Sequence, residues 1–169
     1  MNIEDLKKQI HYASYPQRHH SKCLMKKNPE VINILLKLCY EPIEPLLQQE
    51  AVRILSALIP DEALNVFTKQ SQSYNDSIRL KSFYHLGTLG NPKGINAVLK
   101  GLLDHKPFIR KAAAISAGRL GIDYQAINAL KQVLNPLESK VVKKEAEKSI
   151  SNIKKRINLI KKKNNYNLQ

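Results

Sequence analysis

The sequence has no tryptophan, only two cysteines and no long apolar run, and each of these scarcities excludes a class of protein. Cys23 and Cys39 are not spaced as a CxxC pair, which argues against a zinc site and against a disulfide framework. No stretch approaches the roughly 18 apolar residues of a membrane span, and the N-terminal MNIEDLKKQIHYASY lacks the apolar core of a signal peptide. We therefore expect a protein without a membrane role, located in the cytoplasm or in a plastid stroma.

Acidic residues are scarce as well. Asp and Glu number 14 against 28 for Lys and Arg, which gives a formal net charge of +14. A chain of 169 residues that is 43% hydrophobic can bury a sizeable core, so we expect one folded domain rather than a disordered chain. The excess positive charge favours anionic partners through long-range attraction, and it says nothing about the fold.

A period of 31 residues runs through the middle of the chain. Ile78 recurs as Ile109, and Gly87 recurs as Gly118, each 31 positions later. The same step backward from Ile78 reaches Leu47, and a fainter copy with a drifted register begins near residue 142. The chain therefore consists largely of one repeated structural unit.

Each repeat contains two apolar runs with helical spacing and a turn signal between them. The turn after the first run holds glycine and Asn91-Pro92, because glycine accepts the left-handed conformation that ends a helix and proline suits the first turn of the next. Small residues inside the first runs, Gly87, Ala117 and Gly118, indicate that neighbouring helices approach closely. The pattern predicts an all-α fold, a right-handed α-solenoid of four to five helical hairpins.

The boundaries follow from the repeat. We expect a single solenoid domain over residues 1–160, with the clearest repeats at 46–75, 76–106, 107–137 and 138–160. A basic polar tail is expected over residues 161–169, with the last helix fraying near Lys162. Ahead of the repeats, residues 3–12, 17–27 and 29–40 are expected to be helical.

The residues around the first clear repeat carry a family resemblance. Asp76-Ser-Ile-Arg79 opens the repeat and Leu89-Gly-Asn-Pro92 forms its turn. The segment resembles HEAT-like repeats of the phycobilin-lyase (PBS-lyase) type, with the pattern D-x-x-x-V-R-x-x-A-x-x-A-L-G-x-L-G-[DN]-P. The resemblance is good over residues 76–135 and fair over 46–73 and 141–153. It implies helical hairpins, and it is weak for function because such repeats serve lyases, hydroxylases, adaptors and DNA-binding proteins.

The resemblance also implies ion pairs between consecutive repeats. In such families the basic residue after the aliphatic position pairs with an acid near the inter-repeat turn. Arg79, Arg110 and Lys143 hold the basic place here, and Asp76 and Asp104 are the expected acids.

The residues that enzymes of similar architecture use are missing. Deoxyhypusine hydroxylases carry His-Glu steps as iron ligands, and this chain has no His-Glu dipeptide. HEAT-like alkylpurine glycosylases use tryptophan, which is also missing. Adjacent His19 and His20 would point about 100° apart on a helix, so the two cannot readily share a metal ion. With no nucleophile–base motif and no phosphate loop, we expect no catalytic residue, no metal site and no cofactor.

The 31-residue period also applies to the second helix of each hairpin, where it predicts a column of lysines. Lys69, Lys100 and Lys131 are each 31 positions apart. In right-handed solenoids the face of the second helices is commonly concave and used for binding, although a column of exposed lysines also arises from duplication and solvation alone. We call the predicted partner-binding residues the second-helix surface: Lys69, Lys93, Asn96, Lys100, Tyr124, Asn128 and Lys131.

The C-terminal region concentrates positive charge. We call the following residues the basic C-terminal patch: Lys154, Lys155, Arg156, Lys161, Lys162 and Lys163. One interpretation is a polar cap that keeps the open end of the solenoid from stacking on another molecule. The other is a nucleic-acid or anionic-surface contact whose affinity falls steeply with salt.

Together these features predict a non-catalytic binding module, an adaptor or assembly factor that docks an acidic protein. Two alternatives stay open at this point. One is a nucleic-acid-binding protein that uses the lysine column and the basic C-terminal patch. The other, supported by the resemblance alone, is a phycobilin lyase subunit or phycobilisome-related factor.

Overall fold

The computed structural model describes residues 28–41 and 45–166, and these ranges are helical throughout apart from their turns. The elements are α3 (Pro29–Leu38), α4 (Pro45–Leu58), α5 (Pro60–Gln70), α6 (Asp76–Leu89), the 3-10 turn η1 (Pro92–Gly94), α7 (Ile95–Gly101), α8 (Pro107–Leu120), α9 (Tyr124–Gln132) and α10 (Lys140–Tyr166). No strand occurs in these ranges, and the predicted all-α solenoid class is confirmed. The helices expected over residues 3–12 and 17–27 lie outside the described residues.

The chain divides into two compact units, Met1–Phe67 and Thr68–Gln169. The single domain over 1–160 stays a prediction. In the first unit α3 packs against α4, and Leu35, Leu38 and Leu55 are fully buried there. α3 ends at Leu38, two residues before the end predicted from the sequence.

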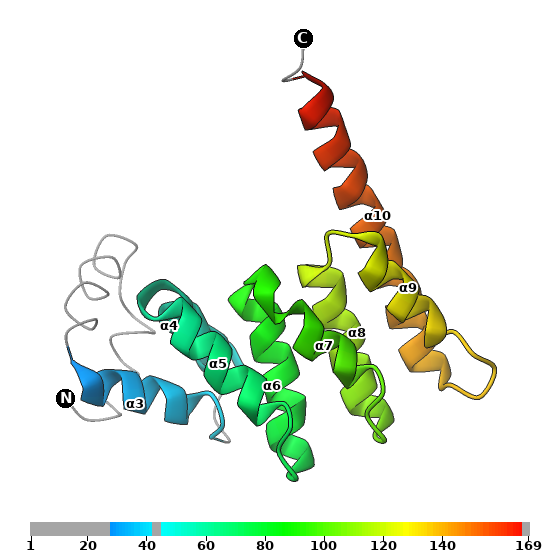
Figure 1. Ribbon diagram of the computed structural model, residues 1–169. Coiled ribbons are helices and arrows are strands. Elements are labelled where there is room, and N and C mark those ends of the chain that lie inside the picture. The colour runs from blue at the N-terminus through cyan, green and yellow to red at the C-terminus, as the bar shows by residue number, and fades with distance from the viewer. Residues whose placement is uncertain (1–27, 42–44, 167–169) are drawn as a thin grey trace. The chain divides into compact units, whose positions relative to one another are not determined.

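The second unit is built from two layers of helices (Figure 1). α6, α8 and α10 lie side by side in the first-helix layer, with α8 packed between the other two. α7 and α9 form the second-helix layer, α7 packing on α8 and on α9, and α9 packing on α10. The core between the layers holds fully buried apolar side chains: Val98, Ile109, Ala113, Leu130, Ala146 and Ile153.

Local sequence signals set the helix ends of this unit. Asn75 caps α6, because its side-chain oxygen accepts from the amides of Ser77 and Ile78 at 2.9 and 3.3 Å. Asp123 caps α9 in the same way, accepting from the amide of Ala126 at 2.9 Å. Gly90 ends α6 at φ 71°, the left-handed conformation that other residues adopt at a cost.

Glycines allow the first helices to approach one another closely. A Cβ atom added at Gly87 would lie 2.5 Å from Ser116 Oγ on α8. One repeat later, a Cβ atom at Gly118 would lie 2.7 Å from Ser149 Cβ on α10. The buried Ser116 hydroxyl donates to the Phe83 carbonyl at 2.6 Å, which links α8 directly to the backbone of α6. The small residues seen in the sequence are therefore contact points between first helices.

α10 is longer than the sequence predicts. It runs for 27 residues to Tyr166, beyond the expected fraying point at Lys162, and so includes most of the predicted polar tail. The segment contains neither glycine nor proline and is rich in lysine and other good helix formers, which explains its continuation. In the described part of the chain, the fourth repeat is this one helix, and its residues from 158 to 164 are all exposed.

Candidate binding surfaces

Arg79 joins two consecutive repeats of the second unit. Its Nε donates to Asp104 Oδ2 at 2.8 Å, and its Nη2 donates to Asp76 Oδ1 at 2.7 Å. Its Nη1 donates to the carbonyl oxygens of Ser73 and Tyr74 at 2.9 and 3.1 Å. The structure thus brings both predicted acids to Arg79, whose side chain is only 9% exposed.

Arg110 repeats this arrangement with a different acid. Its Nε and Nη2 donate to the two carboxylate oxygens of Glu138 at 2.6 and 2.8 Å. Arg110 Nη1 donates to the main-chain oxygen of Asp104 at 2.7 Å and not to the Asp104 carboxylate. The residue one period after Asp104 is Asn135, which has no carboxylate to pair with Arg110. Its side-chain oxygen accepts from the Leu137 amide within the turn. The sequence prediction therefore missed Glu138, which lies three residues further along the longer final turn.

These ion pairs shift the pKa values of their carboxyl groups. The hydrogen bond from Arg110 lowers the pKa of Glu138 below its usual value, and the Ser139 amide acts in the same direction. Partial burial raises the pKa of Asp104, but the donors of Arg79 and the Lys106 amide outweigh it, so the net shift is downward. Both carboxylates are therefore held in the charged form and act as structural links rather than as acids or bases.

The second-helix surface is solvent-exposed in the structure. Asn96 and Lys100 lie one turn apart on α7, and Tyr124, Asn128 and Lys131 follow one face of α9. All seven members of the surface are exposed, including Lys93 in η1 and Lys69 near the end of α5. Among the described residues, neither Lys100 nor Lys131 has an ion-pair partner, so their charges face solvent.

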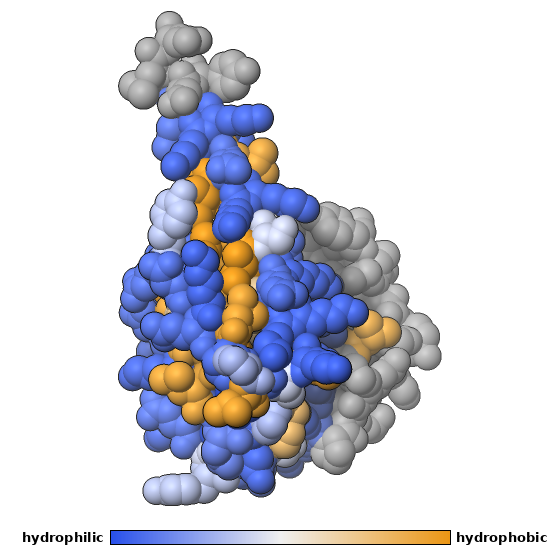
Figure 2. All heavy atoms as spheres, turned by 90° about the vertical axis from the view of Figure 1, so that its right-hand side faces the viewer, coloured by the Kyte–Doolittle hydropathy of each residue, from blue (hydrophilic) through white to orange (hydrophobic). Residues whose placement is uncertain are grey.

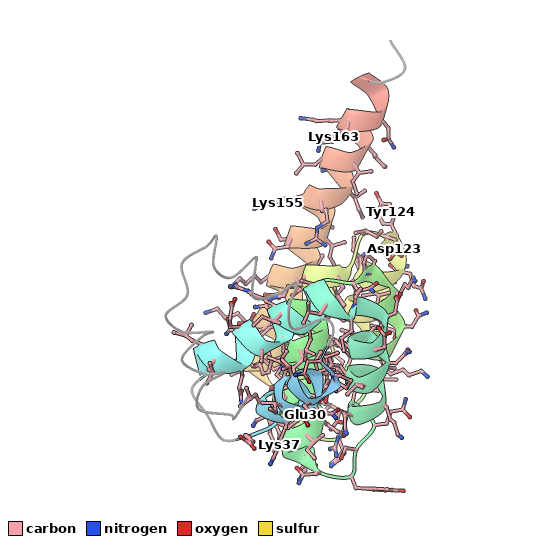
Figure 3. The ribbon with its side chains drawn as sticks, turned by 90° about the vertical axis from the view of Figure 1, so that its left-hand side faces the viewer. Glu30, Lys37, Asp123, Tyr124, Lys155 and Lys163 are labelled. Carbon is pink, nitrogen blue, oxygen red and sulfur yellow. The ribbon has the colours of Figure 1, made fainter. Side chains whose placement is uncertain are left out.

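One contact connects this surface to the basic C-terminal patch. Lys161 Nζ lies 5.7 Å from the ring centre of Tyr124, a cation–π distance. Figure 3 shows Tyr124 at the start of α9, and Lys155 and Lys163 on the part of α10 that extends past the other helices of the unit. The structure thus places Lys161 of the basic C-terminal patch next to Tyr124 of the second-helix surface.

Arg156 differs from the other members of the patch. It donates from Nη2 to the Gly118 carbonyl at 3.0 Å and from Nη1 to the Gly121 carbonyl. These are carbonyls at the C-terminal end of α8, where a cation also offsets the partial negative charge of the helix. Arg156 is therefore half-buried and fixes α10 to α8, whereas Lys154, Lys155 and Lys161 to Lys163 are exposed.

The end of the unit formed by α10 is mostly polar. Figure 2 shows hydrophilic side chains over most of this side, with a narrow apolar stripe between them. Exposed residues on the outer face of α10 include Lys140, Lys144, Glu147, Ser151 and Lys154. Such a surface discourages stacking on a further repeat.

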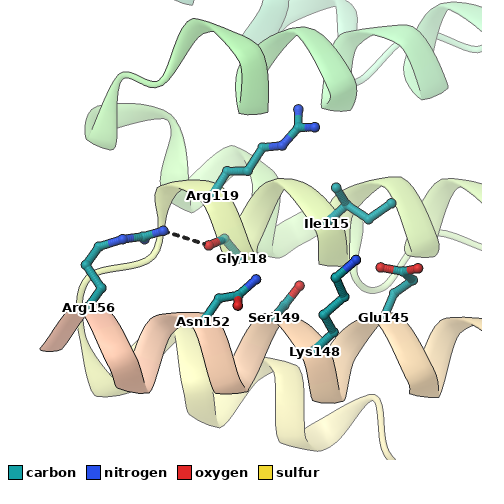
Figure 4. Close-up of a pocket in the computed structure, with 8 residues that line it drawn as sticks. All are labelled: Ile115, Gly118, Arg119, Glu145, Lys148, Ser149, Asn152 and Arg156. Carbon is teal, nitrogen blue, oxygen red and sulfur yellow. Dashed lines mark hydrogen bonds between the residues drawn. The ribbon is translucent and has the colours of Figure 1, made fainter. Parts of the chain in front are cut away.

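A groove that the sequence did not reveal lies between α8 and α10 (Figure 4). Its volume is about 290 Å³, and we call it the α8–α10 groove. It is lined by Ile115, Gly118 and Arg119 from α8 and by Glu145, Lys148, Ser149, Asn152 and Arg156 from α10. All of these belong to first helices, so the groove is separate from the second-helix surface.

Tyr84 of α6 lies near one side of this groove. Burial raises the pKa of the Tyr84 hydroxyl, and the negative charge of Glu145 adds to the increase while Arg119 opposes it. Arg119 Nη1 also lies 3.5 Å from Thr88 Oγ1 on α6. The phenol therefore stays neutral beside the groove.

The described residues include neither a cluster of metal-ligating side chains nor a helix that could span a membrane. They contain no group of three or more His, Cys, Asp or Glu side chains arranged to hold a metal ion. None of the described helices combines the length and the apolar character needed to cross a membrane. His11, His19, His20 and Cys23 lie outside the described residues.

Comparison with known proteins agrees with this geometry. The family model of HEAT repeats matches residues 66–151, about half of the chain. Two crystal structures of engineered proteins share the fold, each at 18% sequence identity. The first has a TM-score of 0.52 over 91% of this chain and 80% of its own. The second has a TM-score of 0.50 over 90% of this chain but only 47% of its own, so this chain spans about half its length. No curated protein matches the chain.

Proposed function

Because the chain belongs to the HEAT-repeat family, whose repeats generally mediate protein–protein interactions, we propose that it is a non-catalytic adaptor or assembly factor. It docks an acidic protein partner on the second-helix surface. The observation that carries this proposal is the exposure of Lys100 and Lys131 at equivalent places on adjacent second helices, without internal carboxylate partners.

The lysines would act on the rate and orientation of binding more than on its affinity. Each exposed ion pair with a partner would contribute at most about 1 kcal/mol, so the column acts mainly by raising the association rate and fixing orientation. Tyr124 supplies an aromatic group at the start of α9, two turns before Lys131, 59% exposed and already in contact with Lys161. Aromatic residues of this kind are enriched at interface centres, where they contribute most of the affinity.

A pull-down with two charge-reversed variants tests the proposal. The first variant carries Lys69→Glu, Lys100→Glu and Lys131→Glu in the second-helix surface. The second carries Lys154→Glu, Lys155→Glu and Lys162→Glu in the basic C-terminal patch, which changes the net charge equally. We expect quantitative mass spectrometry to show loss of acidic partners from the first variant and much smaller loss from the second.

The other outcomes are equally informative. Undiminished recovery by the first variant would refute docking on the second-helix surface. Loss confined to the second variant would assign the contact to the patch. Recovery of nucleic acid, with an affinity that falls steeply as salt rises, would favour a nucleic-acid-binding protein instead.

A further inference from the structure

The α8–α10 groove is extended by apolar side chains beyond its polar centre. On α8, Phe108 precedes Ile115 by seven residues, so both lie on one face of the helix. On α10, Val141 precedes the lining residue Lys148 by seven residues, and Leu159 follows Asn152 by seven. The side chains of Phe108, Val141 and Leu159 are 47%, 57% and 60% exposed, large values for residues of this kind on helices.

The centre of the groove is basic. Arg119, Lys148 and Arg156 line it against the one carboxylate of Glu145, and Lys155 follows Lys148 by seven residues on the same face of α10. Figure 4 shows Lys148 and Glu145 rising from α10 toward α8, while Arg119 reaches from α8 toward α6. Arg156 is committed to the α8 carbonyls, so Arg119 and Lys148 are the cations left to meet a ligand.

We propose that the α8–α10 groove binds an acidic amphipathic helix of a partner protein. Its apolar side packs on Phe108, Ile115, Val141 and Leu159, and its carboxylates pair with Arg119 and Lys148. Val141 and Leu159 are 18 positions apart on α10, about 27 Å, which matches a partner helix of about five turns; α8 flanks this row up to its end near Arg156, and Leu159 lies just beyond, on α10 alone. This way of binding is helix-in-groove recognition, in which the partner helix presents apolar anchor residues at positions i, i+4 and i+7.

Charge and polarity together select this occupant. A nucleic-acid backbone would satisfy the cations but would leave the exposed apolar side chains without a partner. A neutral apolar helix would cover those side chains but would leave Arg119 and Lys148 without carboxylates. The groove is made of first-helix residues, so this site is additional to the second-helix surface and would let the protein hold two acidic elements at once.

A peptide titration of the full chain tests the proposal. The probe is a synthetic 18-residue helical peptide of Leu, Glu and Ala, with leucines at i, i+4 and i+7 spacing and glutamates beside them. A scrambled peptide of the same composition serves as its control. Backbone amide shifts of the ¹⁵N-labelled protein locate the contact, and fluorescence anisotropy gives the affinity.

Two double variants of equal charge separate the sites. Arg119→Glu/Lys148→Glu alters the groove, and Lys100→Glu/Lys131→Glu alters the second-helix surface. We expect amide shifts along α8 and α10, stronger binding of the patterned peptide than of the scrambled one, and a loss of about tenfold or more in the groove variant only. Unchanged amide spectra away from the substituted positions establish that each variant is folded.

Several results would overturn the inference. Equal binding of the two peptides would show attraction by charge alone. Equal losses in the two variants, or shifts confined to α7 and α9, would place the peptide elsewhere. Shifts along the groove caused equally by a single-stranded oligonucleotide would identify an anion site without a helix preference. Each of these leaves the pull-down result for the second-helix surface standing, so the two proposals fail independently.

Discussion

Replacing Arg110 by methionine should destabilise the second unit by about 2–4 kcal/mol. The substitution keeps the aliphatic stem but removes three donors, two to Glu138 and one to the Asp104 carbonyl. The Glu138 side chain is 5% exposed, so its charge would stay buried without a cation. Breaking a buried pair costs about 3–5 kcal/mol, and the value here is lower because Arg110 is 19% exposed and the Ser139 amide still donates to Glu138.

Lys106→Met provides the matched control. Lys106 makes a 3.5 Å contact with Asp76, but both side chains are well exposed, and Arg79 also holds Asp76. Solvent-exposed pairs of this kind contribute little to stability. The two variants lie in the same unit and replace a cation by the same residue, so their difference isolates the buried pair.

The assay is urea unfolding followed by circular dichroism, with amide hydrogen exchange in α8 as a readout of the second unit alone. A double variant, Arg110→Met/Glu138→Leu, completes the cycle. We expect it to be less destabilised than the sum of the two single changes, with a coupling of about 1–3 kcal/mol. If Arg110→Met costs no more than Lys106→Met, the ion pair is not a link between repeats and the reasoning fails.

Three further predictions follow from the same contacts. Gly118→Ala should destabilise the fold by about 1–3 kcal/mol although alanine favours helices, because the added Cβ meets Ser149; urea unfolding measures it, and a stabilised variant would contradict the packing. Arg156→Met should cost about 1–2 kcal/mol and speed hydrogen exchange at the end of α8, since two carbonyls there lose their donor. The pKa values of Asp104 and Glu138 are lower in the folded state than in the unfolded chain, so both carboxylates stabilise the fold. This contribution is complete when the pH is above their unfolded-state pKa values, and it disappears as the pH falls through their folded-state pKa values. The free energy of unfolding should therefore decrease below about pH 4, and this decrease should be smaller in Glu138→Gln.

The sequence predicted the repeated helices because their spacing is a local signal. Helical periodicity and the Asn91-Pro92 turn both act within a few residues, and the structure has helices and a turn where they indicate. The small residue at Gly118 also pointed to close packing. Its partner Ser149 could not be named in advance, because that contact depends on the drifted register between α8 and α10.

The parts that the sequence did not predict depend on contacts between elements. Glu138 was missed because the last inter-repeat turn is longer, so the acid no longer stands one period after Asp104. The α8–α10 groove was missed because it requires the relative rotation of two helices, which spacing within one helix cannot give. The exposure of Lys100 and Lys131 agrees with the predicted second-helix surface, and their use in binding stays a proposal.

Zero-length carbodiimide cross-linking of the protein to its captured partner tests the central claim most directly. The reagent joins a lysine amine to a carboxylate only where the two are in contact, so it reports which lysines face the acidic partner. We predict cross-linked peptides that contain Lys100 and Lys131. Cross-links confined to the basic C-terminal patch, with both of these lysines unmodified in the complex, would contradict the account.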